Sequence, residues 1–225
     1  MKTLVSILKA IPPTKIIDAS IDFSDYIPLD LSITNKELME SKPENASEFE
    51  SFISNYLKSN NAEVAFGGYI EGRTLYKRST IFKNDSVPER NIHIGLDLWT
   101  KVNTAVLAPL DGKVHSFKNN VGLGDYGPTI ILEHEIENEK FYTLYGHLSL
   151  ESIKDLNVGK QFKRGEQIAT LGNAAVNGDY APHVHFQIIQ DIEDYWGDYP
   201  GVCNSNDLNF YIENCPDPNL LLKIT

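Results

Sequence analysis

From about residue 63 onward, the chain consists of short runs of Val, Ile, Leu, Tyr and Phe, interrupted about every 8 to 12 residues by Gly, Pro, Asn or Asp. Runs of this length with regular turn signals are typical of β-strands, and several in succession indicate an all-β sandwich or barrel. The predicted strands are 64–70, 75–82, 105–108, 113–117, 129–134, 141–146, 167–171 and 184–190. The pattern therefore predicts a mainly β core with few helices.

The chain before this core follows another pattern. Ser47 and Glu50 form an S-x-x-E capping box ahead of apolar residues at helical spacing, and the apolar pattern stops near residue 60. We therefore expect an N-terminal extension over 1–62 that contains an amphipathic helix, and a β domain over 63–192. The remaining residues, 193–225, are rich in Tyr, Trp, Asn, Asp and Pro, and are predicted to form an irregular C-terminal cover of the same domain.

The net charge of the chain and its first residues limit the classes of partner that it can bind. With 31 acidic and 20 basic residues, the net charge is -11, which argues against binding nucleic acid or an anionic membrane through a basic surface. The apolar run after Lys2 is cut short by Lys9 and the Pro12-Pro13 pair, so it predicts neither a signal peptide nor a membrane span. We expect a cytoplasmic protein, with a periplasmic or extracellular location as the weaker interpretation. The sequence does not predict an oligomeric state.

The two cysteines, Cys203 and Cys215, lie near the end of the chain without a C-x-x-C spacing. Free thiols in a reducing compartment are the expected state, and a disulfide is the alternative.

Residues able to bind a metal gather in two short segments. In one, His183 and His185 are two residues apart on a predicted strand, so both imidazoles face the same way with Cα atoms roughly 6.5 Å apart. In the other, a straight strand would separate His93 from Asp97 by about 13 Å, too far for both to reach one ion. The chain must therefore bend between them, and Gly95 is the residue that permits a bulge or turn there.

Zinc suits a set of two imidazoles and one carboxylate. Three protein ligands leave the fourth tetrahedral position open for a water molecule, as catalytic zinc sites require. Structural zinc sites usually have four ligands, mostly thiolates, and no cysteine lies near either segment. Zinc can lower the pKa of its bound water to about 7. Other transition-metal ions are the alternative occupants of such a site.

Two glycine-containing turns, at 106–114 and 158–169, resemble those of a barrel-sandwich hybrid. Lipoyl and biotinyl carrier domains share this fold with a group of zinc endopeptidases. Carrier domains present a lysine at a hairpin tip for attachment of the cofactor, and no such tip is found here. The endopeptidase group is therefore the better match.

Three motifs together resemble the lysostaphin-type zinc metalloendopeptidases, many of which cleave peptidoglycan cross-links. They are H-x-x-x-D at 93–97, Y-G-H-L-S at 145–149 and H-x-H at 183–185. The resemblance covers roughly residues 90–190 and implies a duplicated hybrid motif fold. It also implies that His93, Asp97 and His185 bind one Zn²⁺ ion, while His147 and His183 are unliganded active-site residues. One of these two would act as a base and the other would stabilise an oxyanion, and His183 is favoured as the base.

The expected function is hydrolysis of a peptide bond by a zinc-activated water, with peptides or peptidoglycan peptides as substrate. One departure concerns the stretch 173–181, which replaces the short Gly-Ser-Thr-Gly type of turn found in many relatives. This loop would wall the groove and alter specificity. The alternatives are a cytoplasmic zinc amidase acting on a non-wall amide and a non-catalytic hybrid-fold module that binds a partner.

Several other polar residues received a structural interpretation. Arg73, Arg78 and Arg90 are candidates for binding a substrate carboxylate, but solvated surface charges are the expected state. His115 and His134 lie in apolar, strand-like runs and are expected to be structural.

Overall fold

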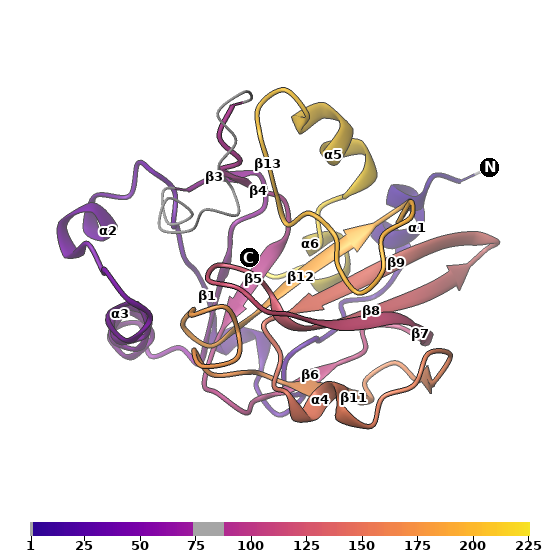
Figure 1. Ribbon diagram of the computed structural model, residues 1–225, viewed down its shortest axis with the longest axis horizontal. Helices are drawn as coiled ribbons and strands as arrows, with labels where there is room; N and C mark the ends of the chain where they lie inside the picture. Colours follow the sequence, from indigo (N-terminus) through magenta and orange to yellow (C-terminus); the bar gives the residue numbers. More distant parts are fainter. Residues whose placement is uncertain (1, 74–87) are drawn as a thin grey trace.

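An eight-stranded sheet runs through the centre of the computed structural model, which describes residues 2–73 and 88–225 (Figure 1). From edge to edge its strands are β1 (Tyr26–Pro28), β2 (Val64–Gly67), β5 (Leu96–Trp99), β12 (His183–Ile189), β9 (Glu139–Gly146), β8 (Gly127–Ile136), β7 (Gly112–Asn120) and β10 (Gln161–Phe162). Neighbours are antiparallel except for β1, which lies parallel to β2. The predicted mainly β fold class is confirmed.

Two smaller sheets accompany the large one. One pairs β11 (Gln167–Thr170) with β6 (Ala105–Leu107), and the other contains β13 (Val202–Cys203), β4 (Ile92–His93) and β3 (Glu71–Gly72). Seven of the predicted strands overlap observed ones, and the eighth, 75–82, lies outside the described residues. Six observed strands were not predicted: β1, β3, β4, β5, β10 and β13. Most of these have only two or three residues, too few to show a periodic pattern.

Local turn chemistry explains the hairpin formed by β8 and β9. β8 and β9 are joined through Glu137 and Asn138, which both have positive φ angles, 53° and 66°. Two consecutive residues in this region form the type I′ turn, whose twist matches that of the strands it connects. The hairpin register follows, with Ile136 opposite Glu139.

The N-terminal extension contains α1 (Leu4–Ala10), a 3-10 turn η1 (Phe23–Asp25), α2 (Lys36–Ser41) and α3 (Ala46–Ser59). Helix α3 is the predicted amphipathic helix, but its cap lies two residues earlier than expected. Asn45 accepts a hydrogen bond from the Glu48 N–H, and the Glu48 carboxylate accepts one from the Asn45 amide. Because Asn45 and Ser47 are each followed three residues later by Glu, the sequence alone does not distinguish the two caps.

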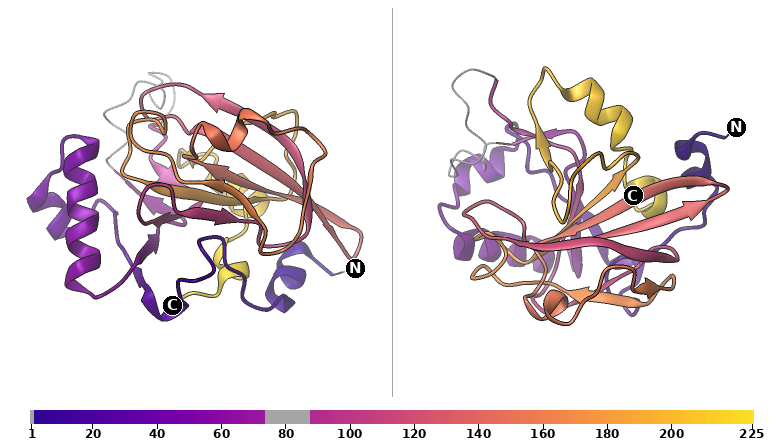
Figure 2. Two further views of the ribbon diagram at one scale, coloured as in Figure 1. Left: turned by 90° about the horizontal axis from the view of Figure 1, so that it is seen from below. Right: turned by 45° about the vertical axis from the view of Figure 1, so that its right-hand side comes forward.

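Helix α3 lies beside the sheet, as both views in Figure 2 show. Its apolar face packs on one end of β2 and β5. The cluster consists of Leu29, Leu31, Phe49, Phe52, Ile53, Tyr56, Ala65, Trp99 and Ala181, with neighbouring apolar residues. Because β1 joins the sheet through β2, the N-terminal extension contributes a strand as well as helices.

The C-terminal region is more regular than the sequence indicates. Besides β13, residues 193–225 form α5 (Leu208–Asn214) and α6 (Asn219–Leu222), and the short helix α4 (Glu151–Lys154) precedes β10. The expectation of an irregular cover is therefore wrong in detail. Leu208, Tyr211 and Cys215 follow one another at helical spacing and pack in one apolar cluster, but the many Asn, Asp and Pro residues around them conceal this pattern.

The largest apolar cluster includes both ends of the chain. Leu4 and Leu8 of α1 and Leu221 and Leu222 of α6 are buried in it together with the sheet. Cys203 and Cys215 are buried free thiols. Among the described residues, no helix is long and apolar enough to cross a membrane.

Candidate metal centre

Strand β12 presents its histidines on one face of the central sheet. Val184, Phe186 and Ile188 alternate with them and lie in the largest apolar cluster, so His183 and His185 share the opposite face. Neighbouring β5 brings Asp97 directly opposite His185 in the strand register. His183 and His185 therefore face the same way on β12, as their spacing of two residues predicts.

The bend predicted between His93 and Asp97 is present as a change of sheet. His93 ends β4 in the three-stranded sheet, and Asp97 lies in β5 of the eight-stranded sheet. Gly95 between them is needed for a close approach: a Cβ at this position would lie 2.4 Å from Cε1 of His185. Only a residue without a side chain lets the chain pass the imidazole here.

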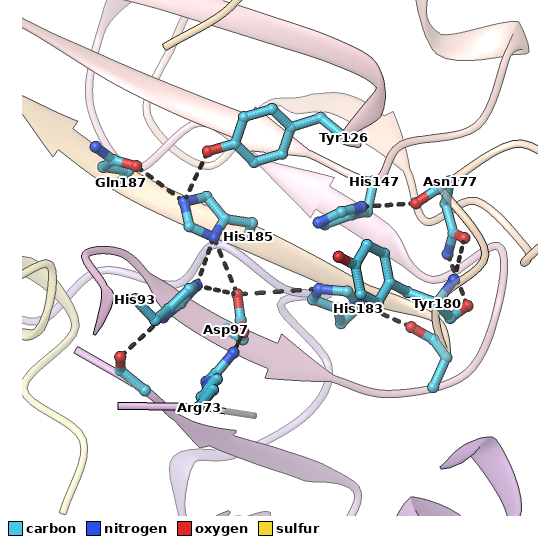
Figure 3. A network of polar contacts seen from close by, with 12 residues as sticks. Arg73, His93, Asp97, Tyr126, His147, Asn177, Tyr180, His183, His185 and Gln187 are labelled. Carbon is cyan, nitrogen blue, oxygen red and sulfur yellow. Dashed lines mark hydrogen bonds and ion pairs between the residues drawn. The ribbon is translucent and has the colours of Figure 1, made fainter. Parts of the chain in front are cut away.

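Three side-chain atoms converge at one point (Figure 3). His93 Nε2 and His185 Nδ1 are 2.8 Å apart, and Asp97 Oδ1 lies 3.2 Å from each of them. A tetrahedral zinc ion with ligand distances of about 2.0 Å would separate its ligand atoms by about 3.3 Å. Two of the separations agree with this value closely and the third is about 0.5 Å shorter, so the three donors are grouped on the scale of such an ion. All three side chains are buried.

Hydrogen bonds on the outer sides of the two imidazoles determine their tautomers. His93 Nδ1 lies 2.8 Å from the carbonyl oxygen of Gly68, to which it donates its proton. His185 Nε2 lies 2.9 Å from Oε1 of Gln187, whose amide nitrogen donates to the Pro200 carbonyl. Each ring therefore carries its proton on the outer nitrogen and turns a lone pair toward the convergence point, as metal ligation requires.

The charge states also favour ligation. Burial lowers the pKa of His93 to about 4, and the Arg73 guanidinium acts in the same direction. Burial would raise the pKa of Asp97, but the nearby His93 and Arg73 hold it well below its usual range. At neutral pH the site therefore offers a neutral His93 imidazole and an ionised Asp97 carboxylate, the forms that bind metal.

His147 and His183 lie beside the three donors without joining them. Their ring centroids are 4.2 Å apart, and His183 Nε2 is 3.9 Å from Asp97 Oδ1. His147 donates from Nδ1 to the Asn177 carbonyl, and His183 from Nδ1 to the Ala181 carbonyl. Burial lowers the pKa of both imidazoles. Both are therefore neutral at neutral pH, with Nε2 able to accept a proton.

The backbone of His147 has a left-handed conformation, with φ of 63°. A histidine in this region is uncommon, and it is held there by two backbone hydrogen bonds, from its N–H to Tyr126 O and from the Gly172 N–H to its carbonyl. Strained backbone held by its surroundings clusters at functional sites. The conformation turns the chain at the end of β9 so that His147 lies against His183.

These five residues line one cavity of about 260 Å³. All three parts of the chain contribute to its wall: Leu31 and Phe49 from the N-terminal extension, Tyr126 and Tyr180 from loops of the β domain, and Tyr199 from the C-terminal region. Tyr180 lies within the 173–181 stretch, so this stretch does wall the cavity. It donates a hydrogen bond to Gly124 O and joins two of the loops.

The expectation that Arg73 is a solvated surface charge is wrong. Arg73 is buried, with 3% of its surface exposed, and its guanidinium binds Glu71 and Asp97. Arg90 donates to the Val202 carbonyl and lines the cavity, while Arg78 lies outside the described residues. Nothing in the local sequence distinguishes the three arginines, since the partners of Arg73 come from β3 and β5.

Gln187 was also missed, although a signal existed. It lies two residues after His185 on a strand, so the same spacing that relates His183 to His185 places its amide on the face of the site. The expectation for His134 is confirmed: it is buried in β8 and hydrogen-bonded to Asp111 and Thr143.

Comparison with known proteins gives matches over the part of the chain that carries this site. Residues 91–195 match the model of peptidase family M23. A protein of Haemophilus influenzae described as an uncharacterized metalloprotease is 33% identical over 95 residues, which make up 42% of this chain and 18% of that relative. The matched segment thus spans less than a fifth of the relative's length.

Two solved structures are similar as well. LytU is 26% identical with a TM-score of 0.38, covering 62% of this chain and 86% of its own. The catalytic domain of the antimicrobial peptidase lysostaphin from Staphylococcus simulans is 24% identical with a TM-score of 0.36, covering 54% of this chain and 80% of its own. The family match confirms the resemblance inferred from the three motifs.

Proposed function

We propose that this chain, whose residues 91–195 match the model of peptidase family M23, is a zinc-dependent metalloendopeptidase that hydrolyses a peptide bond. The observation that carries the proposal is the convergence of His93, Asp97 and His185 beside two unliganded histidines in one cavity. A buried site with three metal-binding donors and two nearby proton acceptors matches the requirements of metal-assisted hydrolysis.

In this proposal His93 Nε2, Asp97 Oδ1 and His185 Nδ1 hold the ion. Zinc bound there would supply a Lewis acid that polarises a carbonyl group and lowers the pKa of water to about 7. The donor set supports zinc over Mg²⁺ or Ca²⁺, because two imidazoles suit a borderline transition metal better than an ion that prefers oxygen ligands.

We assign the role of general base to His183. Its Nε2 is unprotonated at neutral pH and lies closest to the donors, 3.9 Å from Asp97 Oδ1. The Nδ1 proton of His147 is engaged by Asn177, so His147 can donate to a developing oxyanion only from Nε2, after it has gained a proton. Contact between the two rings gives a short route for that proton.

Peptides, including the stem and bridge peptides of peptidoglycan, are the proposed substrates. This class rests on the motifs that resemble lysostaphin-type enzymes. The second candidate is an amidase in the cytoplasm that acts on a small soluble amide. It is favoured by the cavity, which has a volume of about 260 Å³ and is walled by Leu31, Phe49 and Tyr199 from outside the family match. A non-catalytic binding module ranks third, because both accessory histidines are in place.

The Asp97→Ala variant tests the proposal. Wild-type protein should copurify with or take up one equivalent of Zn²⁺ and cleave at least one member of a panel of peptidoglycan stem peptides, bridge peptides and soluble amides. Asp97→Ala should lose zinc binding and hydrolysis together, by several orders of magnitude in kcat/KM, because one of three ligands is missing.

Arg164→Lys is the matched control, since Arg164 is exposed and contacts the carbonyls of Pro12 and Pro13 away from the site. Its activity should equal that of the wild type. Full hydrolysis by metal-free Asp97→Ala would contradict the proposal. Turnover of soluble amides without any cleavage of peptides would select the second candidate, and zinc binding without turnover of either class would favour the third.

A further inference from the structure

The guanidinium of Arg73 contacts one oxygen of Asp97 and leaves the other toward the imidazoles. Arg73 Nη1 lies 2.6 Å from Asp97 Oδ2, while Oδ1 is 3.2 Å from His93 Nε2 and from His185 Nδ1. The two oxygens of this carboxylate therefore have different partners (Figure 3). Because Oδ2 is bound by Arg73, the carboxylate can offer a metal ion only Oδ1.

The backbone places Arg73 beside the strand that carries His93. Glu71 and Gly72 of β3 pair with β4, with Glu71 opposite His93, and the Arg73 N–H continues the pairing by donating to the Asn91 carbonyl at 2.8 Å. The position of the guanidinium is therefore coupled through hydrogen bonds to that of His93.

Further contacts hold the Arg73 side chain. Its Nε lies 2.5 Å from Glu71 Oε2, and the second oxygen of Glu71 accepts the Leu31 N–H at 3.1 Å. The guanidinium also lies 5.6 Å from the ring centroid of Trp99, which follows Asp97 by two residues on β5. Arginine is suited to such a place because its planar fork engages two carboxylates in a fixed geometry, which the single ammonium of lysine does not reproduce.

We propose that Arg73 is a positioning residue for the metal site: it holds Asp97 Oδ2 so that Oδ1 alone faces the ion between His93 and His185. The inference rests on the proposed function in that the three donors bind metal. Arg73 and Glu71 both lie before residue 91, outside the segment that matches the peptidase family, so the N-terminal part of this chain completes the surroundings of the site.

Two effects of Arg73 on metal binding have opposite signs. As a positive charge near a divalent cation, Arg73 repels it, so removal of this charge alone would tighten binding. As the partner that orients Asp97, it favours binding, and loss of such an outer contact typically weakens metal affinity by about 10- to 100-fold. The sign of the change therefore distinguishes orientation from simple charge.

The experiment compares Arg73→Lys and Arg73→Met in the full chain. Lysine keeps the positive charge but lacks the planar set of N–H donors, whereas methionine lacks both. Zn²⁺ affinity is measured by competition with a chromophoric chelator, and the Co²⁺-substituted proteins are compared by visible absorption, which is stronger for four-coordinate than for higher-coordinate Co²⁺. We expect about 10-fold or greater weakening of Zn²⁺ binding in both variants. The Co²⁺ bands should also weaken, because Oδ2 becomes free to join the ion.

Thermal unfolding of the metal-free proteins checks that each variant folds, and Arg164→Lys is the control for an arginine-to-lysine change away from the site. If Arg73→Met does not fold, the Arg73→Lys protein decides by the same two measurements. Unchanged or tighter Zn²⁺ binding with an unchanged Co²⁺ spectrum would overturn the role of Arg73. Absence of Zn²⁺ and Co²⁺ binding by the wild type would overturn the proposed function itself.

Discussion

Six histidines of one chemical type take up different states in this chain because their surroundings differ. His93 and His134 are both buried with a pKa lowered to about 4, yet within the described part of the chain only His93 belongs to a group of metal-binding side chains. His134 instead donates from Nδ1 to the Asp111 carbonyl and accepts at Nε2 from the Thr143 hydroxyl. At the residue scale, the partner on each ring nitrogen decides between a ligand and a structural group.

His134 should make the stability of the protein depend on pH. Its pKa is about 4 in the folded chain and about 6.5 in the unfolded chain, so the unfolded state binds more protons between these values. The contribution of His134 to stability is therefore fully present above about pH 6.5 and is lost as the pH falls toward 4, by about 3 kcal/mol.

Denaturant unfolding of the wild type and His134→Asn at several pH values measures this effect. Asparagine can keep a donor near Asp111 but does not titrate. The difference in unfolding free energy between the two proteins should shrink by about 3 kcal/mol from pH 7 to pH 4. A difference that stays constant over this interval would show that His134 is not buried in its neutral form.

At the scale of elements, the step from β4 to β5 brings His93 and Asp97 together. The two strands belong to different sheets, and Gly95 lies in the connection against the ring of His185. The sequence predicted the bend from the distance that an extended strand would impose. It did not indicate that the imidazole itself excludes a side chain at Gly95, because that contact joins residues 90 positions apart.

Gly95→Ala should therefore impair the metal site more than the fold as a whole. The new Cβ would lie 2.4 Å from His185 Cε1 and 3.0 Å from the Phe186 carbonyl, so the imidazole or the strand must shift. We expect a loss of at least 10-fold in Zn²⁺ affinity and destabilisation by about 1–3 kcal/mol. Chelator competition and thermal unfolding provide the two measurements.

Gly72→Ala is the matched control, since none of the described residues beyond its two chain neighbours places an atom within 4 Å of a Cβ at this position. It should bind zinc as the wild type does. Equal zinc affinity of Gly95→Ala and Gly72→Ala would show that the close approach of Gly95 to His185 has no role in binding.

At the scale of the whole molecule, the segments on either side of the β domain belong to its core. Eight of their apolar side chains are buried in the largest cluster: Leu4, Leu8, Ile16, Ile17, Tyr26, Leu221, Leu222 and Ile224. Fully burying such a side chain contributes about 1.5–3 kcal/mol, and the net stability of a domain is only about 5–15 kcal/mol. The flanks are thus expected to be required for folding.

A fragment containing only residues 63–192 should fail to fold cooperatively. It would lose the strand β1 and expose the surfaces that α1 and α6 cover. Circular dichroism should show no sharp thermal transition for the fragment, in contrast to the full chain. A fragment that melts cooperatively and binds zinc would establish 63–192 as an independent domain and would contradict this expectation.

Much of the fold follows from the sequence alone, because period-two apolar patterns and turn residues are local properties. They predict seven of the observed strands, and the spacing of His183 and His185 predicts that both face one site. The donor types at His93, Asp97 and His185 likewise indicate zinc from their chemistry. Two-residue strands such as β4 carry no comparable pattern and were missed.

The tertiary structure alone determines which polar residues surround these donors. The sequence around Arg73 predicts a surface position. Arg73 becomes a partner of Asp97 because β3 pairs with β4. The Gly68 carbonyl meets the outer nitrogen of His93 for the same kind of reason, whereas Gln187 reaches His185 from two residues along the same strand. Burial and strand register join residues that are far apart in the chain, and neither is encoded in the residues next to any one of them. The sequence by itself therefore determined the donors of the candidate site, and the packing of three chain segments decided their orientation and charge.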